Sequence, residues 1–235
     1  MHYAIIAAGE GSRLVQEGIS VPKPLVELDG RPMIGRLIDI FASYRPESLC
    51  IIVNEQMTEV REYLESLVPT LPFPLHITVK STPSSMHSFY EVSKSFTGGK
   101  FILTTVDTIF RQPDFIKYAE AFDLDTEADG CFGVTDFIDD EKPLYVDVDD
   151  DGFISAFRDA ANGSDRYISG GIYGLTLPAL KVLEDCIEQG VSRMRNYQRA
   201  LVAAGMRLRA FPFPKIVDVD HAGDIETAKA FISQE

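Results

Sequence analysis

Hydrophobic positions along the first half of the chain alternate between two patterns. Short continuous apolar runs, typical of buried strands, are each followed by a stretch with apolar residues at helical spacing, as at Met33, Leu37 and Phe41. This alternation predicts a mainly parallel sheet with helices on both faces and right-handed crossovers. The expected strands cover residues 2–8, 49–53, 75–79 and 101–106, and the expected helices cover 32–44, 57–67 and 86–96.

The pattern changes after about residue 129, where strands follow one another with short connections. Such spacing predicts an antiparallel excursion from the sheet. We therefore expect one α/β domain with a mostly parallel mixed sheet, Rossmann-like, and a small antiparallel lobe. The later expected strands cover 130–137, 144–148, 153–157, 167–175, 207–213 and 216–219, and the helices cover 177–189, 193–204 and 222–233.

Composition and charge narrow the classes of function. The 235 residues are 45% hydrophobic, as expected of a globular protein with a full core. The formal net charge of −14 disfavours a nucleic-acid surface, which needs a basic footprint. No apolar run approaches the roughly 20 residues that span a bilayer, so we expect no membrane partner. The three cysteines are widely spaced, which favours a reducing cytoplasm over a disulfide framework.

The loop after the first expected strand carries the first chemical signal. Glycines at a strand end let backbone N–H groups approach a phosphate closely. Arg13 adds a planar set of donors for phosphate oxygens, and Lys23 adds a mobile point charge. A glycine-rich turn with surface cations is the alternative interpretation. The segments are Ala7-Ala8-Gly9-Glu10-Gly11-Ser12-Arg13-Leu14 and Pro22-Lys23-Pro24-Leu25.

Together these two segments resemble the AAGxGxRL…PKPL signature of the sugar-phosphate nucleotidyltransferase (NTP transferase) family, which includes choline-phosphate cytidylyltransferases. The resemblance extends to three later segments, in the family's order. It implies that Asp107 at a strand end binds Mg²⁺ together with Asp220, with Asp218 as a second candidate. The segments are Thr104-Thr105-Val106-Asp107, Tyr167-Ile168-Ser169-Gly170-Gly171-Ile172-Tyr173 and Asp218-Val219-Asp220-His221-Ala222-Gly223-Asp224.

The resemblance also implies a GT-A-like nucleotidyltransferase domain over residues 1–235. Its nucleotide-binding part would cover about 1–128, its acceptor-binding part about 129–215, and a closing segment with metal ligands about 216–235. Arg13 and Lys23 would be catalytic. The nucleotide would contact Ala8, Gly9, Gly11, Ser12, Arg13, Ser84 and Ser85, and the acceptor would contact Asp159, Gly170, Gly171 and Tyr173.

Several assignments remain alternatives. Ser84 and Ser85 could equally cap the expected helix that follows them. Asp159 lies where sugar-specific relatives carry an acid, but the lysine of their Glu-Lys-Pro segment is absent. The acceptor is therefore either a sugar 1-phosphate or a phosphocholine-like molecule.

The resemblance implies transfer of a nucleotidyl group from a nucleoside triphosphate to a small phosphorylated acceptor, with release of pyrophosphate, by a monomer or homodimer. A catalytically silent sensor of the same fold is an alternative, although such a protein would be expected to lose Arg13, Lys23 or an aspartate. A nucleotide-sugar-dependent glycosyltransferase is another, although only Asp107 stands where a DxD pair is usual. A dinucleotide-binding oxidoreductase would need a GxGxxG turn, and Leu14 stands in place of its third glycine.

Overall fold

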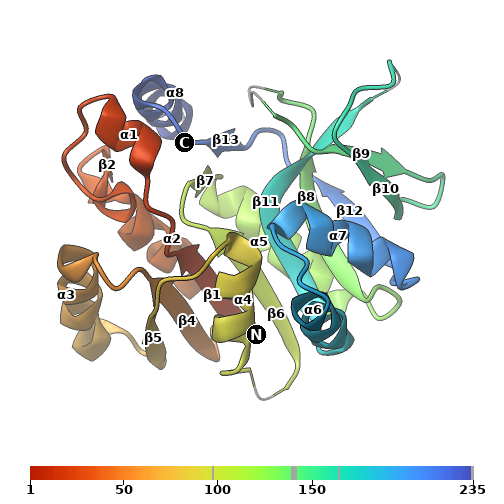
Figure 1. The fold of residues 1–235 in the computed structure, drawn as a ribbon, viewed down its shortest axis with the longest axis horizontal. Coiled ribbons are helices and arrows are strands. Elements are labelled where there is room, and N and C mark those ends of the chain that lie inside the picture. Colours follow the sequence, from red (N-terminus) through yellow and green to blue (C-terminus); the bar gives the residue numbers. More distant parts are fainter. Residues whose placement is uncertain (97, 139–141, 164, 234–235) are drawn as a thin grey trace.

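The fold is built on one mixed sheet in a computed structural model that describes residues 1–96, 98–138, 142–163 and 165–233 (Figure 1). Within these ranges the strands of the main sheet are β1 (His2–Ala7), β4 (Ser48–Val53), β5 (Leu75–Val79), β6 (Lys100–Thr105), β8 (Gly130–Thr135), β9 (Tyr145–Val148), β10 (Ile154–Arg158), β11 (Tyr167–Thr176) and β12 (Leu208–Pro212).

The strand order is β10-β9-β11-β6-β1-β4-β5, and β8 pairs with both β11 and β12. Strands β6, β1, β4 and β5 are parallel to one another. Strand β11 joins this half antiparallel to β6 and also pairs antiparallel with β8 and β9. The expected α/β domain with a parallel half and an antiparallel excursion is therefore confirmed.

Helices cover both faces of the sheet because its strands are apolar on both sides. One core lies between the sheet and helices α2, α3 and α5, and the other lies between the opposite face and helices α4, α6 and α7. The described helices are α1 (Ser12–Gln16), α2 (Met33–Ala42), α3 (Thr58–Leu67), α4 (Ser85–Ser93), α5 (Gln112–Leu124), α6 (Pro178–Glu188), α7 (Met194–Ala203) and α8 (Ala222–Ile232), with short 3₁₀ turns at η1 (Lys23–Leu25) and η2 (Val68–Thr70). Each of these helices is too short or too polar to pass through a lipid bilayer.

A third, smaller core ties the two ends of the chain together. Leu14 of α1 packs in one cluster with Ile225 and Phe231 of α8, and Val217 and Val219 join it just before α8. Figure 1 shows α1 and α8 on the same side of the molecule, above the ends of β1 and β6. Short strand pairs brace this region: β2 (Glu27–Leu28) with β3 (Arg31–Pro32), and β7 (Thr108–Ile109) with β13 (Val217–Asp218).

The structure adds a helix that the hydrophobic pattern could have indicated. Helix α5 buries Phe115, Tyr118, Ala119 and Phe122, whose spacing follows one helical face. Pro113 in its first turn is a common helix-start residue. The Tyr118 hydroxyl donates a hydrogen bond of 2.6 Å to the backbone carbonyl oxygen of Cys131 in β8, so α5 is fixed to the sheet by a polar contact as well.

The closest approach of α5 to the sheet requires a glycine in β11. A Cβ atom at Gly174 would lie 2.7 Å from Cδ1 of Phe122, whose side chain is fully buried. We expect Gly174→Ala to lower the free energy of unfolding by about 1–3 kcal/mol through overpacking. Equilibrium denaturant unfolding measures this change. Gly223→Ala in α8 is the matched control, because a Cβ there would meet nothing within 4 Å. Equal unfolding midpoints for Gly174→Ala and the unsubstituted protein would contradict this packing.

Candidate functional site

The glycine-bearing loop connects β1 to α1 and brings the chain back against Lys23. Gly11 has φ 63° and ψ 27°, a left-handed conformation that favours glycine. A Cβ atom at Gly11 would lie only 2.9 Å from the Cβ atom of Lys23. Gly11 therefore permits both the sharp turn into α1 and the close approach of η1, which carries Lys23.

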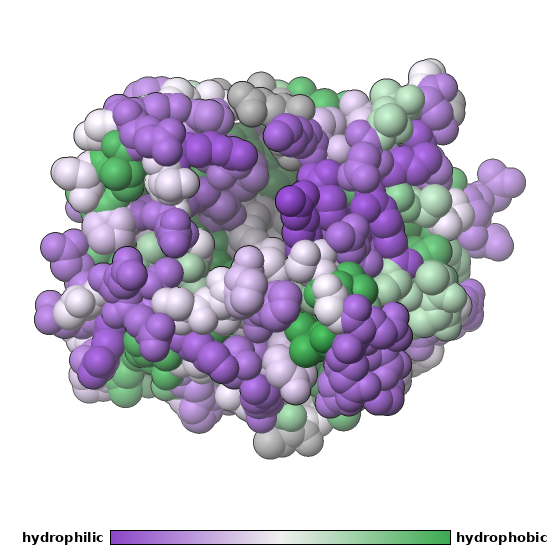
Figure 2. All heavy atoms as spheres, in the orientation of Figure 1, coloured by the Kyte–Doolittle hydropathy of each residue, from purple (hydrophilic) through white to green (hydrophobic). Residues whose placement is uncertain are grey.

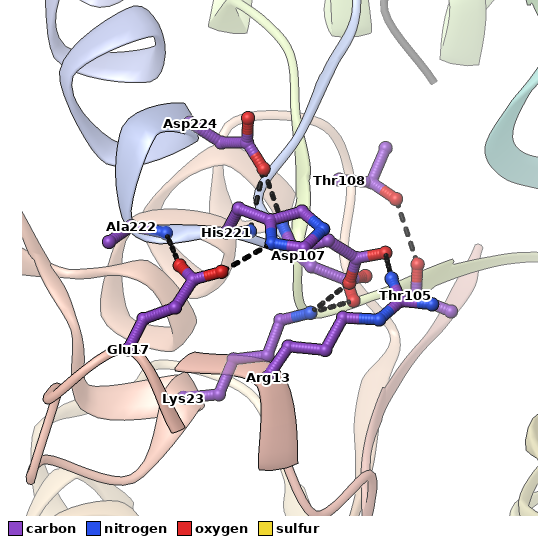
Figure 3. Close-up of polar contacts among 10 residues, drawn as sticks. Arg13, Glu17, Lys23, Thr105, Asp107, Thr108, His221, Ala222 and Asp224 are labelled. Atoms are coloured by element: carbon purple, nitrogen blue, oxygen red, sulfur yellow. Dashed lines mark hydrogen bonds and ion pairs between the residues drawn. The ribbon is translucent and has the colours of Figure 1, made fainter. Parts of the chain in front are cut away.

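Four side chains from distant parts of the chain form one charge cluster, hereafter the charge cluster: Arg13, Lys23, Asp107 and Asp220 (Figure 3). The Lys23 Nζ atom donates hydrogen bonds of 2.6 Å to Asp107 Oδ2 and 2.8 Å to Asp220 Oδ1. Arg13 Nη1 donates to Asp220 Oδ2 at 2.5 Å. The residues that the sequence marked as catalytic and metal-binding thus lie at one place, with Asp220 rather than Asp218 paired to Lys23.

The contacts within the charge cluster favour the charged forms of Lys23 and Asp220. Burial would lower the pKa of Lys23, whose side chain is only 9% exposed, but the carboxylates of Asp107 and Asp220 outweigh burial and raise that pKa above its ordinary value. Burial would likewise raise the pKa of Asp220. Its hydrogen bond with Lys23 and the charges of Lys23 and Arg13 reverse the effect, so the pKa of Asp220 lies below its ordinary value.

The two aspartates are held in place by backbone contacts around the parallel strand ends. Asp107 follows β6, and the Val106 N–H donates to the Ile6 carbonyl of β1 at 3.0 Å. The Asp107 carbonyl accepts a hydrogen bond of 3.1 Å from the Val219 N–H, next to the β7–β13 pair. Ligands of open α/β sheets usually bind at such carboxyl ends.

A carboxylate of α1 fixes the segment that carries Asp220. Glu17 Oε2 accepts a hydrogen bond of 2.6 Å from the Ala222 N–H, and Glu17 Oε1 lies 2.6 Å from His221 Nδ1. The hydrogen bond from the Ala222 N–H has the largest effect and the contact with His221 the next. Together they hold the pKa of Glu17 below its ordinary value. Asp224 caps α8 by accepting hydrogen bonds from the N–H groups of Asp220 and His221 at 2.9 and 2.7 Å. The Asp220 backbone is therefore anchored by Asp224 directly and by Glu17 through the next two residues; Figure 3 shows the Glu17 and Asp224 side chains.

A cavity of about 710 Å³ opens beside the charge cluster. Figure 2 shows the molecule hollowed between its two halves, with mainly hydrophilic residues at the rim. The cavity reaches from the charge cluster to α7. Of the residues predicted from the sequence, its lining includes Arg13, Ser85, Asp107, Gly170, Gly171, Tyr173, Asp218 and Asp220.

The other predicted residues lie outside this lining. Lys23 contacts the cavity-lining aspartates from behind, and Ser84 precedes α4 with its Oγ atom 2.9 Å from His87 Nδ1. Ala8 is buried at the end of β1, whereas Gly9 and Ser12 are exposed and Gly11 is half-buried in the loop. Asp159 lines a second cavity of about 510 Å³, which shares Lys142, Arg193 and Arg195 with the first.

Gly171 shapes the cavity wall in β11. Gly171 has φ 76°, and a Cβ there would lie 2.5 Å from Thr108 Oγ1. The pairing of β11 with β8 shifts register between Ser169 and Tyr173, so the backbone bulges at this point. Bulges commonly occur beside functional sites, where they redirect the strand. The bulge brings the β11 backbone close to Thr108, one residue from Asp107.

Several residues of the site were not predicted from the sequence. Glu17, His221 and Asp224 act through contacts across the fold, and of these only Asp224 has a local signal, an acid three residues after the N-cap residue of α8. Arg193, Arg195 and Gln198 line the far side of the cavity at the start of α7. The sequence predicts a helix here but gives no sign of which cavity it faces.

The donor set suits a hard divalent cation held jointly by protein and phosphates. No group of three or more His, Cys, Asp and Glu side chains in the described ranges is arranged to hold a metal ion. Asp107 and Asp220 nevertheless present carboxylate oxygens to one shared cation, Lys23. Mg²⁺ often binds to one or two carboxylates and completes its coordination with phosphate oxygens and water. The pair therefore fits Mg²⁺ that arrives with a triphosphate.

Comparisons with known proteins agree on one family. Residues 3–146 match the family model described as the MobA-like NTP transferase domain. The chain is 35% identical over 100 residues to the bifunctional protein GlmU of Picosynechococcus sp., a match that covers 43% of this chain and 21% of that protein. GlmU of Neisseria meningitidis serogroup C is 35% identical over 60 residues, or 12% of its length. The chain thus spans at most about a fifth of these relatives.

The whole fold is similar to solved structures. The inositol-1-phosphate CTP transferase from T. maritima matches with a TM-score of 0.82 and 18% identity, covering 99% of this chain and 96% of that one. HddC from Yersinia pseudotuberculosis matches with a TM-score of 0.77 and 19% identity, covering 98% and 99%. At such identities the likeness concerns the fold, and function must be argued from the site.

The arrangement of Lys23 between two carboxylates leads to a stability prediction. In Lys23→Met, Asp107 and Asp220 lose their shared cation and repel each other. We expect the free energy of unfolding to fall by roughly 1–3 kcal/mol, less than for a fully buried pair because both carboxylates keep some solvent contact. Since Mg²⁺ would bind the folded carboxylate pair, it should raise the melting temperature of Lys23→Met more than that of the unsubstituted protein.

Thermal melts with Mg²⁺ and with a chelator measure both effects. Lys181→Met is the matched control, because Lys181 forms an exposed ion pair with Asp185 on α6. Equal Mg²⁺ responses in Lys23→Met and the control would contradict the shared-cation interpretation.

Proposed function

This chain belongs to the family of MobA-like NTP transferase domains, and from that premise we propose that it is a Mg²⁺-dependent nucleotidyltransferase. It would transfer a nucleoside monophosphate from a nucleoside triphosphate to a small phosphorylated acceptor. The observation that carries the proposal is the convergence of Arg13, Lys23, Asp107 and Asp220 beside one large cavity.

The reaction is an in-line displacement. An oxygen of the acceptor phosphate attacks the α-phosphorus of the triphosphate and forms a new P–O bond. The bond between that phosphorus and the oxygen bridging to the β-phosphate breaks, and pyrophosphate leaves with the electron pair. Because the acceptor phosphate is already an anion, no general base is needed. The barrier falls through positioning and charge neutralisation.

We infer supporting roles for the four residues of the charge cluster. Arg13, whose side chain is 51% exposed, can rotate from Asp220 toward the β- and γ-phosphates and bind them with its planar donors. Lys23 stays behind the aspartates and directs its charge toward the α-phosphate and the acceptor. Asp107 and Asp220 would hold Mg²⁺, which supplies charge stabilisation on the transferring group.

For the acceptor we propose a chemical class, not a single compound. The T. maritima relative is named for CTP transfer to inositol 1-phosphate, which is a phosphorylated polyol. A sugar 1-phosphate or similar polyol phosphate suits a cavity of about 710 Å³ with polar walls. The base would lie near the loop of Gly9 and the start of α4, where Ser85 reaches the cavity.

Loss of the Asp107 carboxylate provides the first test. We expect Asp107→Asn to lower the rate of Mg²⁺-dependent pyrophosphate release by about a hundredfold or more, because a metal and charge ligand is lost. The assay screens the common nucleoside triphosphates against sugar 1-phosphates, polyol phosphates and phosphocholine. Asp39→Asn is the control, since Asp39 pairs with Arg31 on the surface of α2. Full activity of a folded Asp107→Asn protein would rule out this mechanism.

The two late aspartates can be distinguished in the same assay. Asp220 bonds to Lys23 and Arg13, whereas Asp218 lies in β13 and is exposed to the cavity. We expect Asp220→Asn to reduce turnover by about a hundredfold and Asp218→Asn to reduce it by less than about tenfold. A metal titration of each variant should show a raised Mg²⁺ requirement for Asp220→Asn. The reverse order of effects would assign the ligand to Asp218.

A further inference from the structure

Among the described residues, the far side of the cavity carries basic side chains, although the chain as a whole carries a net charge of −14. Arg193 and Arg195 line both the main cavity and the second cavity of about 510 Å³, and Arg199 lines the second. We call these three arginines, together with Asp159, the arginine rim. The second cavity therefore continues the acceptor side of the first and ends among guanidinium groups.

We propose that the acceptor carries a second anionic group, a carboxylate or a phosphate, which binds to Arg193 and Arg195 while its first phosphate reacts. This inference rests on the proposed transferase function and narrows its substrate class. It makes Arg193 and Arg195 specificity-determining residues, remote from the reacting phosphorus.

Asp159 organises the arginine rim but does not neutralise it. Arg195 Nη1 donates to Asp159 Oδ1 at 2.6 Å, and Arg199 Nη2 lies 2.7 Å from Asp159 Oδ2. Arg195 Nη2 also donates to the Lys142 carbonyl at 3.0 Å. One carboxylate thus orients two guanidinium groups, each about one-third exposed. Guanidinium forks that are held in place in this way bind planar or tetrahedral anions well.

Arg193 adds a further positive charge beside Arg195. It has φ 71° and ψ 138°, a conformation that L-residues rarely adopt and that often marks functional sites. Its N–H donates to Ser84 Oγ at 3.2 Å, which connects α7 to the segment before α4. In the described part of the chain, the Arg193 side chain makes no ion pair. The N-terminal end of α7, of ten residues, adds its own partial positive charge at the same place.

Part of the cavity floor is polar and uncharged. Gln198 is 3% exposed, and its Oε1 accepts a hydrogen bond of 3.0 Å from Ser169 Oγ while its Nε2 donates to the Tyr173 hydroxyl at 3.3 Å. Such a floor suits a hydroxylated middle section. The arrangement matches an acceptor with phosphate at one end, hydroxyl groups in the middle and an anion at the other end.

The arginine rim argues against a choline-like acceptor. A quaternary ammonium group is normally bound by an aromatic cage, often beside a carboxylate. In the described lining of the main cavity the Phe and Tyr side chains are Phe137 and Tyr173, and the Tyr173 hydroxyl is engaged by Gln198. The described lining of the second cavity has one such side chain, Tyr145, beside Asp159, and one ring does not form a cage. Arg193 and Arg195 would repel a cation at the far end. The charge distribution therefore favours the acidic acceptor over phosphocholine.

Matched acceptor pairs test this inference. Glucose 1-phosphate and glucuronic acid 1-phosphate differ only in replacement of a hydroxymethyl group by a carboxylate. Glycerol 3-phosphate and 3-phosphoglycerate form a shorter pair, and glucose 1-phosphate and glucose 1,6-bisphosphate form a phosphate pair. We expect the more anionic member to have about a tenfold higher kcat/KM in at least one pair, mainly through KM, because a charged hydrogen bond is gained. Phosphocholine should be a poor acceptor.

Arg195→Gln and Arg193→Gln are the variants, and Arg61→Gln, at an exposed ion pair on α3, is the control. Each variant should reduce the preference for the anionic acceptor about fivefold or more while changing kcat/KM for the neutral member by less than about threefold. A general structural defect would lower both values alike. The inference is overturned if the neutral member is equal or better in every pair, if phosphocholine matches the best acidic acceptor, or if neither variant changes the preference.

A binding measurement separates this inference from the proposed function. If no combination of triphosphate and acceptor releases pyrophosphate, the transferase proposal fails. Calorimetric titration with glucuronic acid 1-phosphate and glucose 1-phosphate then decides the inference alone. Tighter binding of the acid that is lost in Arg195→Gln supports the arginine rim as an anion site, and equal binding of the two sugars overturns it.

Discussion

One buried ammonium group determines how this fold presents its site. Lys23 bonds to Asp107, 84 residues later, and to Asp220, 197 residues later. Bringing three segments so distant in sequence to one point involves a large loop-closure entropy, which the surrounding packing must offset. The cluster of Leu14, Val217 and α8 supplies apolar burial, and the Glu17 contacts to His221 and Ala222 supply polar anchoring. The charged site is consequently an integral part of the N- and C-terminal packing.

Both carboxylates bond to one ammonium group, which explains the need for Lys23. Two carboxylates at one place repel each other unless a cation lies between them. Lys23 supplies that cation, and its charge and hydrogen bond hold the pKa of Asp220 below its ordinary value. Arg13, more exposed than the others, is the member of the charge cluster best placed to change partners. Pre-organised charge of this kind is the main means by which enzymes stabilise phosphoryl transition states.

Much of this arrangement was accessible from the sequence, although by different routes. The strand–helix alternation in the first half predicted the parallel strands correctly because buried strands read as continuous apolar runs. The proximity of Asp107 and Asp220 followed from the family resemblance, since no local pattern relates positions so far apart. Helix α5 was missed despite a clear apolar face. The arginine rim could not be predicted, because the facing of α7 depends on tertiary packing and on the unusual backbone of Arg193.

We propose that Asp107 and Asp220 hold a metal ion together with a triphosphate. Anomalous diffraction from crystals grown with Mn²⁺ and an α,β-methylene nucleoside triphosphate tests this directly. We expect an anomalous peak coordinated by both carboxylates, with the triphosphate bound by Arg13 and the loop of Gly9. A metal peak elsewhere, or a bound triphosphate that leaves both aspartates paired only with Lys23, would contradict it.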